Sequence, residues 1–337
     1  METNSGRSRP VASGPRGPGV LGEKAMTASR SPVVHMAHRQ SYEEDGLRSA
    51  AADCLDHALD REIRKSTVLL KPNFISRQNA FLSCTHPGLI EAVCAHFSDL
   101  ENRVLVGDSP AFGSARSVAS ALDLPERLAP FGARIVELKP GKQAARRTAE
   151  GPALAQIPDD VELVVNLPKL KAHKQMGISG ATKNLFGLVP GARKAVAHVR
   201  HGQSHRAFAH MLLDLLPDYP ESVSLLDGIR AMEKSGPTDG EPRDCGILAA
   251  SRNPLALDTA VYLALGLTRE DVPLWQAATE RQLPGTDPET IAYSGMKPQQ
   301  LRMDFRMPEC LNAVSFHPLR LAKSICKRGL ARLRPAG

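Results

Sequence analysis

Short apolar runs alternate along the chain with longer segments in which apolar residues recur every three or four positions. The short runs predict strands at residues 32–38, 68–71, 103–107, 134–138, 162–166, 222–226 and 246–250. The longer segments predict helices at residues 42–59, 86–100 and 255–265, and a further helix from Ser114. Thr85 is expected to cap the N-terminus of the helix at 86–100. This alternation is typical of an α/β domain in which a mostly parallel sheet has helices on both faces.

The two ends of the chain differ from this body. Residues 1–30 are rich in Gly, Ser, Arg and Pro and are predicted to form a disordered N-terminal extension. They contain no apolar run of signal-peptide length, whereas a transit peptide and a start at Met26 or Met36 are both open alternatives. Residues 31–300 are predicted to form the α/β domain. Residues 301–337 are predicted to be a basic, helical C-terminal tail.

The segment 318–334 within this tail places an apolar stripe beside six arginine and lysine side chains. One interpretation is a basic amphipathic helix that contacts an anionic membrane surface or an acidic partner. The other is a helix packed on the body of the protein. Gly329 weakens a helix, and the stripe has no aromatic anchor, so the sequence favours packing over membrane contact.

The net charge of +7 belongs to the ends of the chain. Residues 1–40 carry +4 and residues 310–337 carry +6, so the body between them carries −3. Aromatic residues make up 4% of the chain. A basic binding face and stacking aromatics are typical of nucleic-acid binding, so no nucleic-acid partner is expected. The longest apolar runs fall far short of the roughly 18–20 residues of a membrane span, and we expect a cytoplasmic protein.

Six cysteines are scattered along the chain, and no two are closer than ten residues. A zinc ribbon or a ferredoxin-type cluster needs pairs at CxxC spacing, which is absent. The sequence therefore predicts reduced, buried thiols, no metal site and no iron–sulphur cluster from these cysteines.

Polar residues beside a proline follow three of the predicted strands. They are Lys71–Asn73, Gly107–Pro110 and Asn166–His173. Because the carboxyl ends of parallel strands meet at one edge of the sheet, these three loops are expected to share a crevice.

The stretch 163–213 contains no aspartate or glutamate but eight lysines and arginines and five histidines. Such a run indicates an anionic ligand. The glycine-rich segment 177–184 is expected to bring backbone N–H groups to the anion at a helix start, although the Walker and dinucleotide-binding spacings are absent. His198, His201 and His205 have helical spacing, but no carboxylate is near them, so surface or phosphate-facing roles are favoured over a metal site.

These observations define the candidate site. The lysines are expected to hold the anion, and His173, made neutral by its positive neighbours, is expected to act as a general base. Asp108 and Asp227 are expected to orient a cation or the lysines. The candidate catalytic residues are His173, Lys171 and Asp108. The candidate substrate-binding residues are Lys71, Asn73, Ser109, Asn166, Lys169, Lys183, Asn184 and Asp227.

Taken together, these strings resemble the domain of unknown function 362 family. The matching pieces are Leu69–Asn73, Gly107–Pro110, Asn166–His173, Gly180–Gly187, Asp227–Gly228, Gly236–Gly240 and Ser251–Asp258. The resemblance implies a common α/β domain without a settled activity. Many relatives carry ferredoxin modules with eight clustered cysteines, and this chain departs from them. The family is also similar, more distantly, to lactate racemase-like domains that hold a cofactor with Lys and His.

Three functions follow as alternatives. The first is an enzyme that acts on a small phosphate- or carboxylate-bearing metabolite in a crevice lined by lysine and histidine. The second is a redox or cofactor-handling accessory protein of iron–sulphur metabolism, which the family resemblance implies. The third is a binding module that uses its basic tail. The sequence leaves the cofactor and the reaction open.

Overall fold

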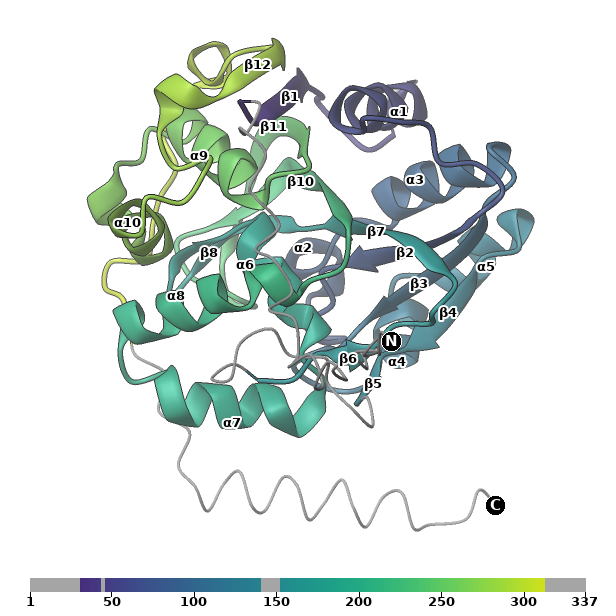
Figure 1. Ribbon diagram of the computed structural model, residues 1–337, viewed down its shortest axis with the longest axis horizontal. Helices are drawn as coiled ribbons and strands as arrows, with labels where there is room; N and C mark the ends of the chain where they lie inside the picture. The colour runs from purple at the N-terminus through teal and green to yellow at the C-terminus, as the bar shows by residue number, and fades with distance from the viewer. Residues whose placement is uncertain (1–30, 44–45, 141–151, 313–337) are drawn as a thin grey trace, which may run out of the picture. The chain divides into compact units, whose positions relative to one another are not determined.

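The computed structural model describes residues 31–43, 46–140 and 152–312. In this part of the chain a ten-stranded, mostly parallel sheet has the order β12-β1-β11-β10-β7-β2-β3-β4, and β8 and β9 extend it beside β10 (Figure 1). The sheet strands are β1 (Val33–His38), β2 (Thr67–Pro72), β3 (Arg103–Asp108), β4 (Arg134–Glu137), β7 (Val161–Leu167), β8 (Lys169–His173), β9 (Gly177–Ser179), β10 (Ser222–Glu233), β11 (Glu241–Ser251) and β12 (Ala292–Gly295). A separate short pair joins β5 (Lys139–Pro140) to β6 (Ala155–Gln156).

Helices cover both faces of this sheet, as the sequence predicts (Figure 1). One face carries α1 (Leu47–Ala58), α3 (Pro87–Asp99), α4 (Ala115–Ser120) and α5 (Leu124–Leu128). The other face carries α6 (Ala181–Leu185), α8 (His205–Asp214), α9 (Pro254–Ala264) and α10 (Pro273–Glu280). The short helix α2 (Ala80–Ser83) follows β2, and α7 (Gly191–His201) follows α6. The predicted α/β class is therefore confirmed.

All seven predicted strands and the four predicted helices occur, but three local predictions need correction. The segment after β7 was expected to be a loop, whereas residues 169–173 form strand β8. Its alternation of Leu170 and Ala172 with polar residues is a strand pattern, and all five residues are buried. Thr85 does not cap α3. Instead His86 caps it, and the Thr85 hydroxyl donates to the carbonyl of Leu167 at 2.6 Å.

The predicted tail begins inside the domain. Residues 302–312 contain no helix, and Phe305 is buried against the core while Arg306 pairs with Glu233. The amphipathic segment 318–334 and the N-terminal extension 1–30 lie outside the described residues. Among the helices that the structure describes, none is long and apolar enough to cross a membrane.

Candidate functional site

A cavity of about 330 Å³ lies where β2, β3 and β8 end, and α6 and α7 close it. Six of the residues predicted for the site line it: Asn73, Asp108, Lys171, His173, Lys183 and Asn184. Lys194 and His198 of α7 complete its polar wall, and Phe74, Phe112 and Phe186 contribute apolar surface. A cavity of this size, mostly apolar with a few convergent polar groups, suits a small-molecule ligand.

Lys171 lies at the end of a chain of buried amides. Its ammonium group donates to the Oδ1 atom of Asn73 and, at 2.6 Å, to the carbonyl of Ser83. The Asn73 amide donates to Asn184 at 2.8 Å, and Asn184 donates to Asn166 at 2.9 Å. Because the amide nitrogens of Asn73 and Asn184 both donate along the chain, the orientation of each side-chain amide is fixed. The Oδ1 atom of Asn73 therefore faces Lys171. Asn166 therefore supports the wall of the cavity from behind.

Lys71 and Asp108 form a buried ion pair at the base of the cavity. Their side chains are 0% and 2% exposed, and the Nζ–Oδ1 distance is 3.0 Å. The Asp108 carboxylate also accepts the backbone N–H groups of Phe74 and Ser109, each at 2.8 Å. With three donors on this carboxylate, Asp108 is suited to orienting Lys71 rather than to exchanging protons.

Lys183 differs from the other lysines of the site. Lys194 donates to the carbonyl of Ser109, and Lys171 and Lys71 have the partners given above. In the described part of the chain, the Lys183 amino group makes no hydrogen bond and no ion pair. Burial, with Lys194 nearby, lowers its pKa to about 7. Burial likewise lowers the pKa of Lys171 to about 7 and that of Lys194 to about 8.

His173 is held as a neutral ring. Burial, together with Lys183 and Lys171, lowers its pKa well below the usual range. Its Nδ1 atom accepts the backbone N–H of Gln175 at 3.1 Å. A neutral ring that accepts at Nδ1 carries its proton on Nε2. This tautomer favours hydrogen-bond donation over the general-base role expected from the sequence.

The glycine-rich segment does not offer its helix N-terminus to an anion. The N–H groups of Ala181 and Thr182 at the start of α6 donate to the Asp258 carboxylate, at 2.5 and 2.9 Å. The same carboxylate faces Gly180, where a Cβ atom would collide with it. Asp258 is only 2% exposed. The cationic side chains, and not this backbone, are thus available to a ligand.

Two predicted residues, Lys169 and Asp227, lie outside the cavity. Their ammonium and carboxylate groups pair at 3.0 Å, and both side chains are fully buried. The Tyr42 hydroxyl also donates to Asp227, and the backbone N–H of His86 does so at 2.8 Å. This cluster ties the middle of β10 to the start of β8, to the N-terminus of α3 and to the segment before α1. Ser109 is likewise not part of the cavity wall. Its hydroxyl accepts the backbone N–H of Gly191 at 3.1 Å.

Comparison with known proteins shows similarity over most of the chain. Residues 68–262 match the family described as Domain of unknown function (DUF362). The chain belongs to this family. A thylakoid-associated protein of Synechocystis sp. is 33% identical over 309 residues, which cover 87% of this chain and 93% of that protein. The family predicted from the sequence strings is thereby confirmed.

Solved structures show weaker similarity to this DUF362 chain. The lactate racemase apoprotein of Thermoanaerobacterium thermosaccharolyticum is 10% identical with a TM-score of 0.38, over 69% of this chain and 57% of that one. A Thermotoga maritima protein is 11% identical with a TM-score of 0.34, over 58% of this chain and 53% of that one. The chain therefore spans little more than half the length of these two structures.

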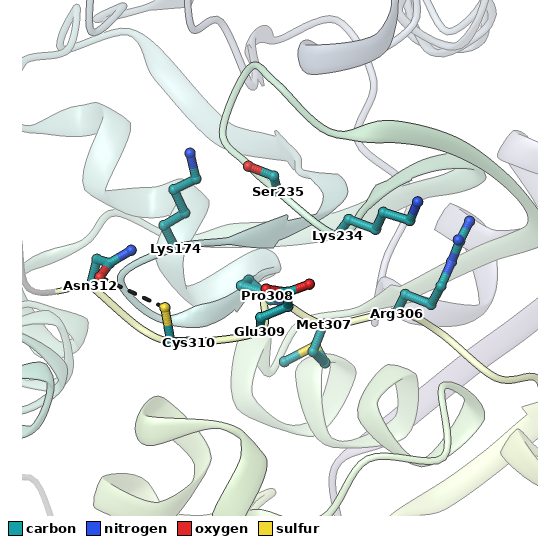
Figure 2. A pocket seen from close by; sticks show the side chains of 9 residues that line it. All are labelled: Lys174, Lys234, Ser235, Arg306, Met307, Pro308, Glu309, Cys310 and Asn312. Carbon is teal, nitrogen blue, oxygen red and sulfur yellow. Dashed lines mark hydrogen bonds between the residues drawn. The ribbon is translucent and has the colours of Figure 1, made fainter.

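A second cavity of about 550 Å³ contains Lys174, Lys234 and Arg306, which Figure 2 shows around its wall. Here acidic partners neutralise two of these three cations. Lys234 pairs with Glu241 at 2.6 Å, and Arg306 pairs with Glu233. Because the first cavity keeps its lysines free of carboxylates apart from the Lys71–Asp108 pair, it is the stronger candidate for an anion.

The described residues include one group whose potential ligand atoms lie close enough to hold a metal ion, His35, Asp53 and His57, and none of the three lines the cavity. Hydrogen bonds account for this group. The His57 ring lies 2.8 Å from the carbonyl of Asp53, and the His35 ring lies 2.6 Å from the hydroxyl of Ser294. The cysteines Cys54, Cys84, Cys94 and Cys245 are free and buried, and Cys310 is free and exposed. Cys326 lies outside the described residues.

Gly187 keeps space for the Lys71–Asp108 pair. A Cβ atom at this position would overlap both the Asp108 carboxylate and the Lys71 ammonium group. We therefore expect Gly187→Ala to lower the free energy of unfolding by about 1–3 kcal/mol, because both side chains are buried and three donors hold the Asp108 carboxylate in place. Urea-induced unfolding measures this change. A loss below about 0.5 kcal/mol would show that the pair can shift aside without cost.

Proposed function

We propose that this DUF362 protein is an enzyme that acts on a small phosphate- or carboxylate-bearing metabolite in the first cavity. The observation that carries the proposal is the set of three lysine amino groups, on Lys171, Lys183 and Lys194, that reach the cavity without forming an ion pair in the described structure. Buried cations without a counter-ion are costly, and an anionic ligand removes that cost.

The neighbouring residues support this assignment. Lys171 and Lys194 are held in place by carbonyl and amide oxygens, which leaves N–H bonds for a ligand oxygen. His173, neutral and protonated at Nε2, is suited to donate a hydrogen bond to the bound molecule. Asp108 orients Lys71 beneath them. The four remaining predicted residues, Asn73, Asn166, Asn184 and Ser109, hold these groups in position.

Two further expectations from the sequence, on location and on an alternative role, stay proposals. A cytoplasmic location is one, and the name of the Synechocystis relative states an association with thylakoids for that protein. The other is the alternative role as a redox or cofactor-handling accessory protein. The buried, separate thiols do not favour it. Visible absorbance of anaerobically purified protein, which an iron–sulphur cluster would give, distinguishes this accessory role from the first proposal.

The pH dependence of anion affinity tests the proposal. Sulfate is a suitable probe because its charge stays constant between about pH 6 and about pH 9. The ammonium forms bind the anion, and the pKa values of Lys171 and Lys183 are about 7 in the empty site. Raising the pH through this range removes their protons, so we expect the affinity to fall by up to roughly tenfold per pH unit for each proton taken up on binding.

Isothermal titration calorimetry of the full chain measures this trend. Lys234→Met is the matched control, because Lys234 lies in the second cavity and pairs with Glu241. Its affinity should equal that of the wild type at every pH. An affinity that is constant or rises with pH would rule out the lysines of the first cavity as the anion site.

A further inference from the structure

Lys183 has the properties of a nucleophile rather than of a permanent cation. Its amino group faces the cavity, and the described residues supply no acceptor that would hold its protons. Burial and the neighbouring Lys194 disfavour a positive charge on it, and Lys171 and His173 line the same cavity. A lysine that is desolvated beside other cationic groups is the usual setting for attack on a carbonyl carbon.

We infer that Lys183 forms an imine with a small 2-oxo acid bound in this cavity. The inference deepens the proposed function, on which it rests, by naming the substrate class. Lys171 and Lys194, each fixed by its own hydrogen bonds, are placed to hold the carboxylate. Lys183, which has no such bonds, is left to react with the neighbouring keto group. This assignment of roles follows from the different hydrogen-bond contacts of the three amino groups.

The chemical step is balanced without any oxidant or reductant. The lone pair of the Lys183 nitrogen forms a bond to the keto carbon, and the carbonyl oxygen takes up a proton. The nitrogen then loses its protons, the oxygen leaves as water, and a carbon–nitrogen double bond remains. The two protons that the nitrogen loses are the two that leave with the oxygen as water, and the Nε2–H of the neutral His173 ring can donate a hydrogen bond to that oxygen. Lys183 and His173 line the same cavity.

The cavity also explains why this amine would be selective. The cavity lining includes Phe74, Phe112 and Phe186, which provide an apolar surface beside the lysines. Such a surface excludes water from the imine and strengthens the attraction between carboxylate and ammonium groups. The volume of about 330 Å³ is at the small end of ligand cavities, which suits a compact acid.

Borohydride trapping tests the inference. The full chain is incubated with pyruvate, reduced with borohydride and analysed by intact mass and peptide mapping. We expect one reduced adduct per chain, located on Lys183 and suppressed by excess sulfate. Its formation should be half-maximal near pH 7, because the pKa of Lys183 is about 7 and only the unprotonated amine attacks.

Two variants make the result specific. Lys183→Arg keeps the positive charge but cannot form an imine, so it should bind sulfate and give no adduct. Lys174→Met changes an exposed lysine outside the cavity and should give the adduct of the wild type. Adducts spread over surface lysines, or unchanged in Lys183→Arg, would overturn the inference. If the wild-type protein binds sulfate but forms no adduct, only the inference is overturned. If the wild-type protein does not bind sulfate, the proposed function is overturned as well.

Discussion

Lys183→Met is expected to weaken sulfate binding by roughly 10–100-fold, the loss of about 1.5–3 kcal/mol that a charged hydrogen bond contributes. Methionine has a similar volume and shape, and the described structure shows no partner of Lys183 that the change would leave unsatisfied. Removing a buried amine also removes its desolvation cost. The free energy of unfolding should therefore stay the same or increase.

Calorimetric titration with sulfate near pH 6, together with urea-induced unfolding, measures both effects. Lys174→Met is the control for charge, because its side chain is exposed near the second cavity. It should bind sulfate like the wild type. If Lys183→Met also binds sulfate like the wild type, Lys183 is no part of an anion site. If it loses stability, the lysine has a structural role that its contacts do not indicate.

Asp227→Ala is expected to lower the free energy of unfolding by about 3–5 kcal/mol, the cost of leaving one charge of a buried pair without its partner. Lys169 is fully buried at 3.0 Å from this carboxylate. The Tyr42 hydroxyl and the backbone N–H of His86 lose their acceptor at the same time. Burial and Asp227 already raise the pKa of Tyr42, so the hydroxyl stays protonated and needs an acceptor.

Asp60→Ala is the matched control for this change. Asp60 is 79% exposed and pairs with Arg252 at 2.7 Å, so its loss should cost less than about 1 kcal/mol. Urea-induced unfolding of both variants gives the comparison. Equal stability of the two would mean that Lys169 reaches water or another acceptor when Asp227 is removed.

Part of the site follows from the sequence because the position of each strand along the chain is a local property. Apolar runs placed the strands, and parallel strands bring their carboxyl ends together, so Asn73, Asp108 and Lys171 meet as expected. The absence of acids from 163–213 also pointed to Lys183, whereas Lys194, in the same run, was not among the predicted site residues. These signals depend on residues that are near each other in sequence or at equivalent places on neighbouring strands.

The rest depends on contacts between distant segments. Lys169 is paired because β8 adds to β10 in a register that brings it to Asp227, 58 positions later. Asp258 reaches the start of α6 from a helix 76 positions away and takes the N–H groups that an anion was expected to use. The spacing of these residues in the sequence predicts neither contact. The tautomer of His173 likewise follows from one backbone contact with Gln175.

The binding position of a simple anion tests the central claim most directly. A crystal structure of the full chain grown with sulfate should show the ion in the first cavity, within hydrogen-bond distance of Lys171, Lys183 and Lys194. The account would be contradicted if the ordered sulfate lay instead beside Lys174 and Arg306 in the second cavity, with the first cavity holding only water.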